Sequence, residues 1–154
     1  MTLKEFVNQM LEYSNKTNSN YSKWFYKKGQ FFNKINTSES DQLCKLFRSE
    51  LKMCYINCAK ICLLTEKYDY YEGYVSVYGV PLQHAFLVNK KGEVVDPTLA
   101  IREENHDEKT NDLIYDDYFG HNIPKKDLQK IAFKKNSGDW LISYYQKKEK
   151  KNHV

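Results

Sequence analysis

The chain has 154 residues, of which 41% are hydrophobic, and this length suffices for one folded domain over residues 1–154 with its own core. Its net charge of +4 comes almost wholly from lysine, since Arg48 and Arg102 are the only arginines. The scarcity of arginine disfavours nucleic-acid binding, because arginine supplies most bidentate contacts to bases and phosphates. No apolar run is long enough to span a bilayer, and charges interrupt the amino-terminal segment, so we expect no membrane association and a cytoplasmic location.

The first predicted element is a helix over residues 2–14, whose apolar side chains recur on one face. The polar stretch from Ser14 to Asn20 should end it. Aromatic residues and lysines alternate through residues 21–36, to which no regular element can be assigned. Such a mixture could stack on nucleobases, but a half-buried segment with lysines facing water is the more common arrangement.

Residues 37–41 carry N-cap chemistry and precede a long apolar-periodic run that reaches Leu64. The pattern leaves open whether this run is one helix or two. It contains all four cysteines within nineteen residues, a poor layout for disulfides that fits a reducing compartment. Three of them recur every four residues and could line a metal site, but Cys58 and Cys62 lie where a helix would face its core. We expect free thiols and no metal; the cysteines are Cys44, Cys54, Cys58 and Cys62.

Three antiparallel strands are predicted next. Residues 70–78 alternate in side-chain character, and residues 79–81 then turn the chain. The apolar runs 82–88 and 93–96 are joined by a short connection containing glycine, which is typical of a β-hairpin.

The length of the hairpin loop decides which side chains share a face. In a three-residue loop over 90–92, with Gly92 in the left-handed conformation, Phe86 pairs with Asp96. His84 and Asp96 are then diagonal neighbours on one face, about 7–8 Å apart at Cα, which a hydrogen bond between their side chains can span. A two-residue loop would place them on opposite faces.

Residues 101–118 are charged and mostly unpatterned, so we expect a surface loop. Pro124 precedes a predicted helix over 125–135, and a last helix should carry Trp140, Leu141, Tyr144 and Tyr145. Residues 146–154 form a basic tail that is expected to fray.

Cys54, His84 and Asp96 are the residue types that a cysteine nucleophile requires. The thiol attacks, the imidazole moves the proton, and the carboxylate orients the imidazole. A histidine and an aspartate near a hairpin are more commonly ordinary strand and turn residues, so spacing alone does not decide between these interpretations.

The order of a cysteine-bearing helix, a strand, a strand with histidine and a strand with aspartate resembles that of the papain-like and transglutaminase-like superfamily. More narrowly, the chain looks like a family of short, uncharacterised bacterial and phage proteins with the pattern C-[YF]-x-N-A, E-G-[YF], H-A-W, [VI]-D-P-T and Y-x-G. The resemblance covers about residues 54–120, with Cys58 in place of alanine and Phe86 in place of tryptophan. The matching segments are Cys54-Tyr55-Ile56-Asn57, Glu72-Gly73-Tyr74, His84-Ala85-Phe86, Val95-Asp96-Pro97-Thr98 and Tyr118-Phe119-Gly120.

The resemblance implies an α+β fold with a papain-like or transglutaminase-like core, in which a cysteine-bearing helix packs on a small antiparallel sheet, with additional helices at both termini. It implies Cys54 as nucleophile, His84 as general base and acid, and Asp96 as the group that fixes the imidazole tautomer. No cofactor is implied.

Four further residues are supporting candidates: Asn57, Glu72, Tyr74 and Phe86. Asn57 could orient the loop before Cys54 or contact substrate, although a helical asparagine is more often solvated or capping. Glu72 and Tyr74 share a strand face that could line a cleft, although an edge carboxylate paired with lysine is the commoner arrangement. Gln42 and Gln83 are weaker candidates as oxyanion donors.

Activation of Cys54 requires that it open a helix, because the N-terminal end of a helix stabilises a thiolate. We therefore expect a break between Arg48 and Met53, even though no glycine or proline marks one. The function expected is acyl transfer through a thioester on a protein, peptide or small amide substrate. The alternatives are a non-catalytic interaction or inhibitor protein on the same fold and, third, a nucleic-acid-binding domain.

Overall fold

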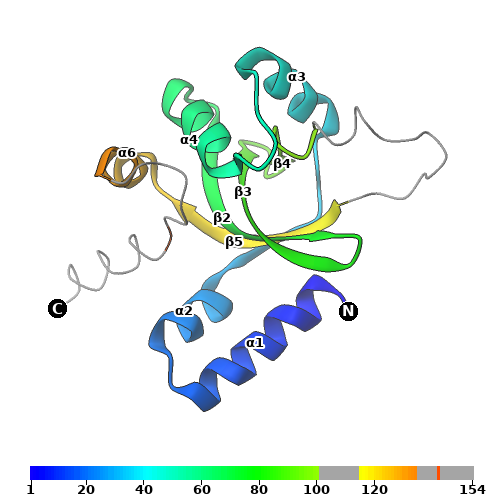
Figure 1. Ribbon diagram of the computed structural model, residues 1–154, viewed down its shortest axis with the longest axis vertical. Helices are drawn as coiled ribbons and strands as arrows, with labels where there is room; N and C mark the ends of the chain where they lie inside the picture. Colours follow the sequence, from blue (N-terminus) through cyan, green and yellow to red (C-terminus); the bar gives the residue numbers. More distant parts are fainter. Residues whose placement is uncertain (101–114, 135–141, 143–154) are drawn as a thin grey trace.

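The structure, a computed structural model, describes residues 1–100, 115–134 and Ile142. In this part of the chain the fold is α+β, with five helices and a curled five-stranded sheet. The helices are α1 (Leu3–Thr17), α2 (Asn20–Lys28), α3 (Thr37–Phe47), α4 (Cys54–Leu64) and α6 (Lys125–Lys134), and the strands are β1 (Gln30–Phe32), β2 (Tyr68–Val77), β3 (Val80–Asn89), β4 (Val94–Val95) and β5 (Tyr115–Ile123). Neighbouring strands pair antiparallel in the order β1-β5-β2-β3-β4. In the view of Figure 1, α3 and α4 are drawn above the curled strands, and α1 and α2 below them.

Side chains cap the first three helices. The Thr2 hydroxyl accepts from the Glu5 N–H at 3.1 Å, and the Glu5 carboxylate accepts from the Thr2 N–H at 2.7 Å, which completes a capping box for α1. Ser19 and Asn36 each accept from a backbone N–H in the first turn of α2 and α3.

Helix α1 continues to Thr17, three residues beyond the end that the sequence pattern predicts. The hydroxyls of Ser14 and Thr17 donate to the carbonyls one turn earlier, at 2.6 and 3.1 Å, so these residues remain helical. The helix ends at Asn18, which is left-handed with φ of 58°. Asparagine tolerates this conformation better than most residues.

The aromatic segment 21–36 contains α2 and β1 and is half-buried. Phe25 and Tyr26 are buried, and the Trp24 ring stacks on His121 with 4.2 Å between centroids. These rings pack within the protein, whereas Lys27 and Lys28 face solvent.

The apolar run that follows is two helices, which confirms the predicted break. Helix α3 ends at Phe47, and Arg48 adopts φ of 51°. Lys52 is also left-handed, with φ of 63°, and α4 begins two residues later at Cys54. Two left-handed residues without glycine thus reverse the chain and place Cys54 at a helix start.

The sequence predicts three of the five strands. The predicted turn over 79–81 is wrong, because the turn in the structure is shorter and begins one residue earlier. The turn consists of Tyr78 and Gly79, whose φ values of 50° and 75° suit a two-residue hairpin, so Val80 and Pro81 belong to β3. Strand β5 begins inside the segment that was expected to be a loop, while residues 101–114 lie outside the described residues.

The hairpin between β3 and β4 has the expected register. Gly92 is left-handed with φ of 78°, and the Asn89 N–H donates to the Glu93 carbonyl at 2.9 Å. Leu87 pairs with Val95 in the ladder. The next pair along the chain therefore aligns Phe86 with Asp96, as a three-residue loop requires.

The curl of the sheet brings its two edges together. Ile35, just after β1, forms a bridge with Val94 of β4, and the Asn36 N–H donates to the Val94 carbonyl at 2.9 Å. The concave face buries one apolar cluster, while the convex face packs against α1, α2, α4 and α6. The concave cluster contains Val75, Val77, Phe86, Val88, Val94, Leu99 and Tyr118.

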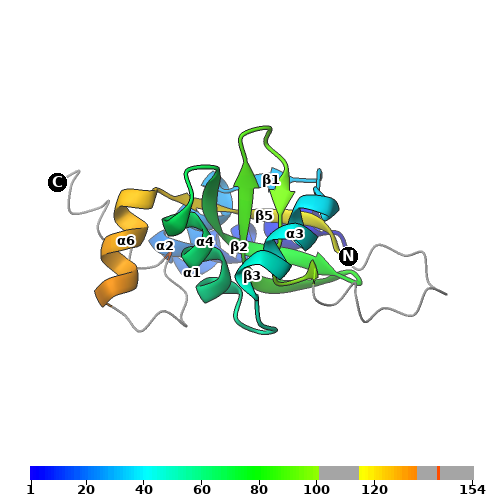
Figure 2. The ribbon, with the colours of Figure 1, turned by 90° about the horizontal axis from the view of Figure 1, so that it is seen from above.

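Helix α6 follows Pro124 as expected. Figure 2 shows it at the opposite end of the molecule from the turn between β2 and β3. The predicted last helix around Trp140 and the basic tail 146–154 lie outside the described residues, apart from the buried, helical Ile142. None of the described helices is long and apolar enough to cross a membrane.

Candidate active site

Cys54 is the first residue of α4 and is 8% exposed. The N-cap residue, Met53, makes no side-chain hydrogen bond to the helix, in contrast to the caps of α1, α2 and α3. The first N–H groups of a helix have no intrahelical acceptor, and together with the helix dipole they favour a negative charge. The start of α4 can therefore stabilise an anion at the sulfur or at an oxygen bound beside it.

His84 and Asp96 form the hydrogen bond that their register predicts. His84 Nε2 and Asp96 Oδ2 are 2.7 Å apart, and the two residues are 6% and 0% exposed. Asp96 occupies Nε2, and the Cys54 side chain lies close enough to the His84 ring to favour its charged form. The structure thus brings the three predicted residues together, with His84 between Asp96 and Cys54.

The open edge of β3 explains how a helix on the convex side reaches a histidine on the concave face. Strand β4 pairs with β3 only at Leu87 and Val88, so in the described part of the sheet no strand covers the remainder of this edge. Helix α4 packs against β3, and the Cys58 thiol donates to the Ala85 carbonyl with 3.4 Å between sulfur and oxygen.

Asp96 is held by four donors. Its Oδ1 accepts from the N–H groups of Thr98 and Leu99 at 3.2 and 3.0 Å, and its Oδ2 accepts from the Tyr118 hydroxyl at 2.8 Å as well as from His84. Burial alone would raise the pKa of this carboxyl, but the interaction with His84 and the hydrogen bonds outweigh it, so the pKa is lowered. Asp96 therefore remains an anion.

The pKa of His84 moves in the opposite direction. Burial disfavours the imidazolium, but the Asp96 carboxylate and then the Cys54 side chain favour it more strongly, so the pKa of His84 is raised. The geometry consequently favours a protonated histidine beside the Asp96 carboxylate.

Asn57 orients the loop before Cys54, which was one of its two expected roles. Its Oδ1 accepts from the Glu50 N–H at 3.2 Å, and its Nδ2 donates to the Glu50 carbonyl at 2.8 Å and to Thr98 Oγ1 at 2.9 Å. A single buried side chain therefore ties the loop that precedes the nucleophile to the turn that follows Asp96.

The neighbouring cysteines are buried thiols, as expected. Burial, followed by the nearby Asp96 charge, raises the pKa of Cys58 well above its usual value, and burial raises the pKa of Cys62 to about 11. Within the described residues, no group of three or more His, Cys, Asp or Glu side chains could hold a metal ion.

Two supporting candidates, Glu72 and Tyr74, lie on the opposite face of the sheet from His84. Glu72 lies in the central strand β2 and is fully buried, so the expectation of an edge carboxylate paired with lysine is wrong. Its carboxylate accepts from the Tyr70 hydroxyl at 2.7 Å and from the Ile142 N–H at 2.8 Å. Tyr74 lies on the same convex face, with its hydroxyl 3.1 Å from that of Tyr26.

Phe86 shares the concave face with His84 and is fully buried, packed edge-on against Tyr118 with 4.9 Å between centroids. It supports the sheet beneath the site. The weaker oxyanion candidates are not placed at the triad: Gln83 is exposed opposite Tyr74, and Gln42 lines a hollow beside Tyr68.

Sequence reasoning missed two contacts of Asp96. The Ser40 hydroxyl of α3 accepts from the Asp96 N–H at 2.9 Å, and the Tyr118 hydroxyl binds the carboxylate. Tyr118 begins the Y-x-G motif, which was a signal without an assigned role. Nothing local marks Ser40, because it lies 56 residues from its partner.

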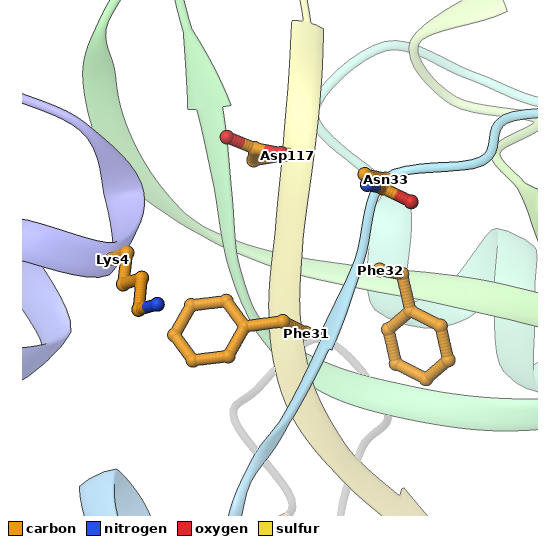
Figure 3. A pocket seen from close by; sticks show the side chains of 5 residues that line it. All are labelled: Lys4, Phe31, Phe32, Asn33 and Asp117. Atoms are coloured by element: carbon orange, nitrogen blue, oxygen red, sulfur yellow. The ribbon is translucent and has the colours of Figure 1, made fainter.

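Two hollows on the described surface lie elsewhere. One of about 300 Å³ is lined by Lys4, Phe31, Phe32, Asn33 and Asp117. Figure 3 shows the Lys4 side chain extending from α1 toward the Phe31 ring, with Asp117 projecting from β5. A second, of about 510 Å³, lies between α3 and Tyr68. Neither is lined by a triad residue.

Comparison with protein-family models, with curated proteins and with solved structures finds no match to this chain. The functional argument therefore depends on the geometry of the site itself.

Proposed function

We propose that the protein is a thiol-dependent acyl-transfer enzyme with a Cys54-His84-Asp96 triad on a papain-like or transglutaminase-like core. The observation that carries this proposal is the buried hydrogen bond of 2.7 Å between His84 Nε2 and Asp96, formed beside a cysteine that opens a helix without a side-chain cap. A buried histidine–aspartate pair near a cysteine, with the pKa of His84 raised and that of Asp96 lowered, is typical of a catalytic site.

In this mechanism the Cys54 sulfur attacks the acyl carbon of the substrate, and the carbonyl electrons move onto the oxygen. Backbone N–H groups at the start of α4 stabilise the oxyanion. As the tetrahedral intermediate collapses, the protonated His84 gives its Nδ1 proton to the leaving nitrogen, and a thioester remains on Cys54. His84 then removes a proton from the second substrate, which attacks the thioester and releases Cys54.

Asp96 acts without changing its protonation state. Four hydrogen bonds fix its carboxylate, and the carboxylate in turn fixes the orientation of His84 and stabilises the imidazolium. Water is the simplest second substrate, which gives hydrolysis of an amide or isopeptide bond or deamidation of glutamine. An amine as second substrate gives transglutamination. The acyl donor in each case is a protein, a peptide or a small amide.

The acyl-enzyme is the intermediate to detect. Incubation with p-nitrophenyl acetate followed by rapid acid quench should leave one acetyl group on the peptide containing Cys54. Cys54→Ser should abolish this label, and His84→Gln should lower its rate of formation. Cys62→Ser is the matched control, because Cys62 is a buried thiol on the same helix, and it should leave the label unchanged. Equal acetylation of several cysteines would contradict the proposal.

A non-catalytic interaction protein on the same fold is the second candidate. It is favoured by the burial of the triad, since Cys54 and His84 are largely covered and the two hollows described above do not reach them. In that case the triad residues serve stability alone, and p-nitrophenyl acetate should acetylate Cys54 no faster than it does the unfolded chain.

A further inference from the structure

Tyr118 lies on β5, 22 residues from Asp96 in sequence, and its hydroxyl donates to the carboxylate at 2.8 Å. It binds Oδ2, the same oxygen that His84 Nε2 contacts. One carboxylate oxygen therefore accepts two hydrogen bonds, and the two donors share its negative charge.

The surroundings of Tyr118 hold this contact in place. The side chain is fully buried in the concave cluster, and its ring packs against Phe86 at 4.9 Å and lies 6.4 Å from the His84 ring. Strand β5 pairs with β2 at Val75, which fixes the position of Tyr118 relative to the central strands. The hydroxyl is thus aimed at Asp96 by packing on several sides.

We infer that Tyr118 is a positioning residue of the triad, which anchors the Asp96 oxygen that orients His84 and limits how firmly this oxygen holds the imidazole proton. For its catalytic consequence the inference rests on the proposed function. The contact itself can be measured on His84 whether or not the protein turns over a substrate.

The titratable groups that face His84 in the described part of the chain come from three places. Asp96 follows β4, Cys54 opens α4, and Tyr118 on β5 acts through Asp96. A donor that shares the Asp96 charge weakens the pull of the carboxylate on the proton at Nε2. Removing that donor should strengthen the bond between His84 and Asp96 and make the imidazolium harder to deprotonate.

This tuning suits a histidine that must work in both directions. His84 has to release a proton to the leaving nitrogen and then accept one from the second substrate. A carboxylate that held the imidazolium too firmly would slow the first of these steps, and an unanchored carboxylate would let the ring rotate away from Cys54.

Tyr118→Phe removes the hydroxyl and keeps the ring, and Tyr70→Phe is its matched control. Tyr70 is equally buried, lies on the adjacent strand β2, and donates to a carboxylate at 2.7 Å, but that carboxylate belongs to Glu72. Both substitutions therefore delete one buried phenol–carboxylate hydrogen bond, and only one of them concerns the triad.

The readout is nitrogen NMR of the imidazole rings, with the His84 signals assigned by His84→Gln. Tyr118→Phe should raise the midpoint of the His84 titration by about half to one pH unit, since only part of the lost hydrogen bond to the carboxylate is transmitted to the imidazole. It should also move the Nε2 proton further downfield. Tyr70→Phe should change neither quantity. An equal response to both substitutions, or no response to either, would overturn the inference.

A second variant guards against loss of folding. Site-specific replacement of Tyr118 by 3-fluorotyrosine retains the hydroxyl but makes it a stronger donor, so the His84 midpoint should move to lower pH. An unchanged midpoint would again overturn the inference. Failure of the proposed function has a different signature: absence of acyl-Cys54 in the unsubstituted protein, whatever the response of His84 to substitution at position 118.

Discussion

Asn57 provides the most quantitative test of how the site is held together. Its side chain makes three hydrogen bonds, two to the backbone of Glu50 and one to Thr98 Oγ1, and it is almost entirely buried. Asn57→Ala removes all three and leaves the loop before Cys54 without its link to the turn after Asp96.

The expected cost follows from the individual bonds. The two shorter ones, at 2.8 and 2.9 Å, should contribute about 1 kcal/mol each, and the longer one, at 3.2 Å, about half as much. Asn57→Ala should therefore lower the free energy of unfolding by about 2–3 kcal/mol. For a chain of this length the loss corresponds to a fall in Tm of about 5–10 °C.

Thr98→Val isolates the bond between the two segments. It should cost about 1 kcal/mol, and the double variant should cost little more than Asn57→Ala alone, because the two substitutions remove the same contact. The exposed Asn33 offers a control, since Asn33→Ala should change stability by no more than about 0.5 kcal/mol.

Urea unfolding measures these free energies, and the rate of iodoacetamide modification at Cys54 measures the positioning. We expect Asn57→Ala to reduce that rate under conditions where the variant remains folded. A loss of less than about 1 kcal/mol in the free energy of unfolding would refute the assigned role of Asn57 in linking the loop before Cys54 to the turn after Asp96. A Cys54 modification rate equal to that of the unsubstituted protein would refute it as well.

Four further outcomes are expected. His84→Gln should lower the alkylation rate of Cys54 by about 100-fold at pH 6.5, because an ordinary cysteine is only about 1% thiolate there; a change of less than threefold would contradict the role of His84. The lowered pKa of Asp96 means that its contribution to stability is present above its ordinary value of 3.8 and is lost as the pH falls through the folded value, so acid unfolding should be less steep in Asp96→Asn. Because the pKa of His84 is raised, its contribution to the free energy of unfolding is complete below pH 6.5 and declines as the pH rises through the folded value. The loss of stability at alkaline pH should therefore be smaller in His84→Gln. If the stability curve of Asp96→Asn or His84→Gln ran parallel to that of the unsubstituted protein, the proposed contribution of that residue would be wrong. Gly92→Ala should cost about 1 kcal/mol in urea unfolding, because φ of 78° strains a side chain, and an unchanged midpoint would show that the loop can adopt another conformation.

The part of the site that lies within one hairpin could be predicted from the sequence. His84 and Asp96 are joined by a short loop, and the presence of Gly92 specifies the register that places them on one face. Side chains alternate with a period of two along a strand, so parity alone decides this relation.

The start of α4 was predicted by a different route. No helix breaker separates Phe47 from Cys54, and the break follows from what the chemistry of a cysteine nucleophile requires. The structure achieves it with Arg48 and Lys52 in the left-handed conformation, an arrangement for which neither residue type gives a sequence signal.

The missed contacts join segments that are distant in sequence: Ser40 of α3 lies 56 residues from Asp96, and Tyr118 belongs to β5. Strand β1 has three residues, and β5 begins among charged residues at the end of an unpatterned segment, so neither shows the alternation by which strands are recognised. Without β5, Tyr118 had no place near Asp96, and Glu72 was assigned to an edge rather than to the centre of the sheet.

Selective alkylation tests the central claim most directly. At pH 6, limiting iodoacetamide followed by peptide mapping should modify Cys54 ahead of the other three cysteines in the unsubstituted protein, and the buried thiols of Cys58 and Cys62, whose pKa values are raised, should stay unmodified while the protein is folded. The same experiment on His84→Gln should abolish the preference. Equal modification of all four cysteines, or none at Cys54, would contradict the catalytic triad.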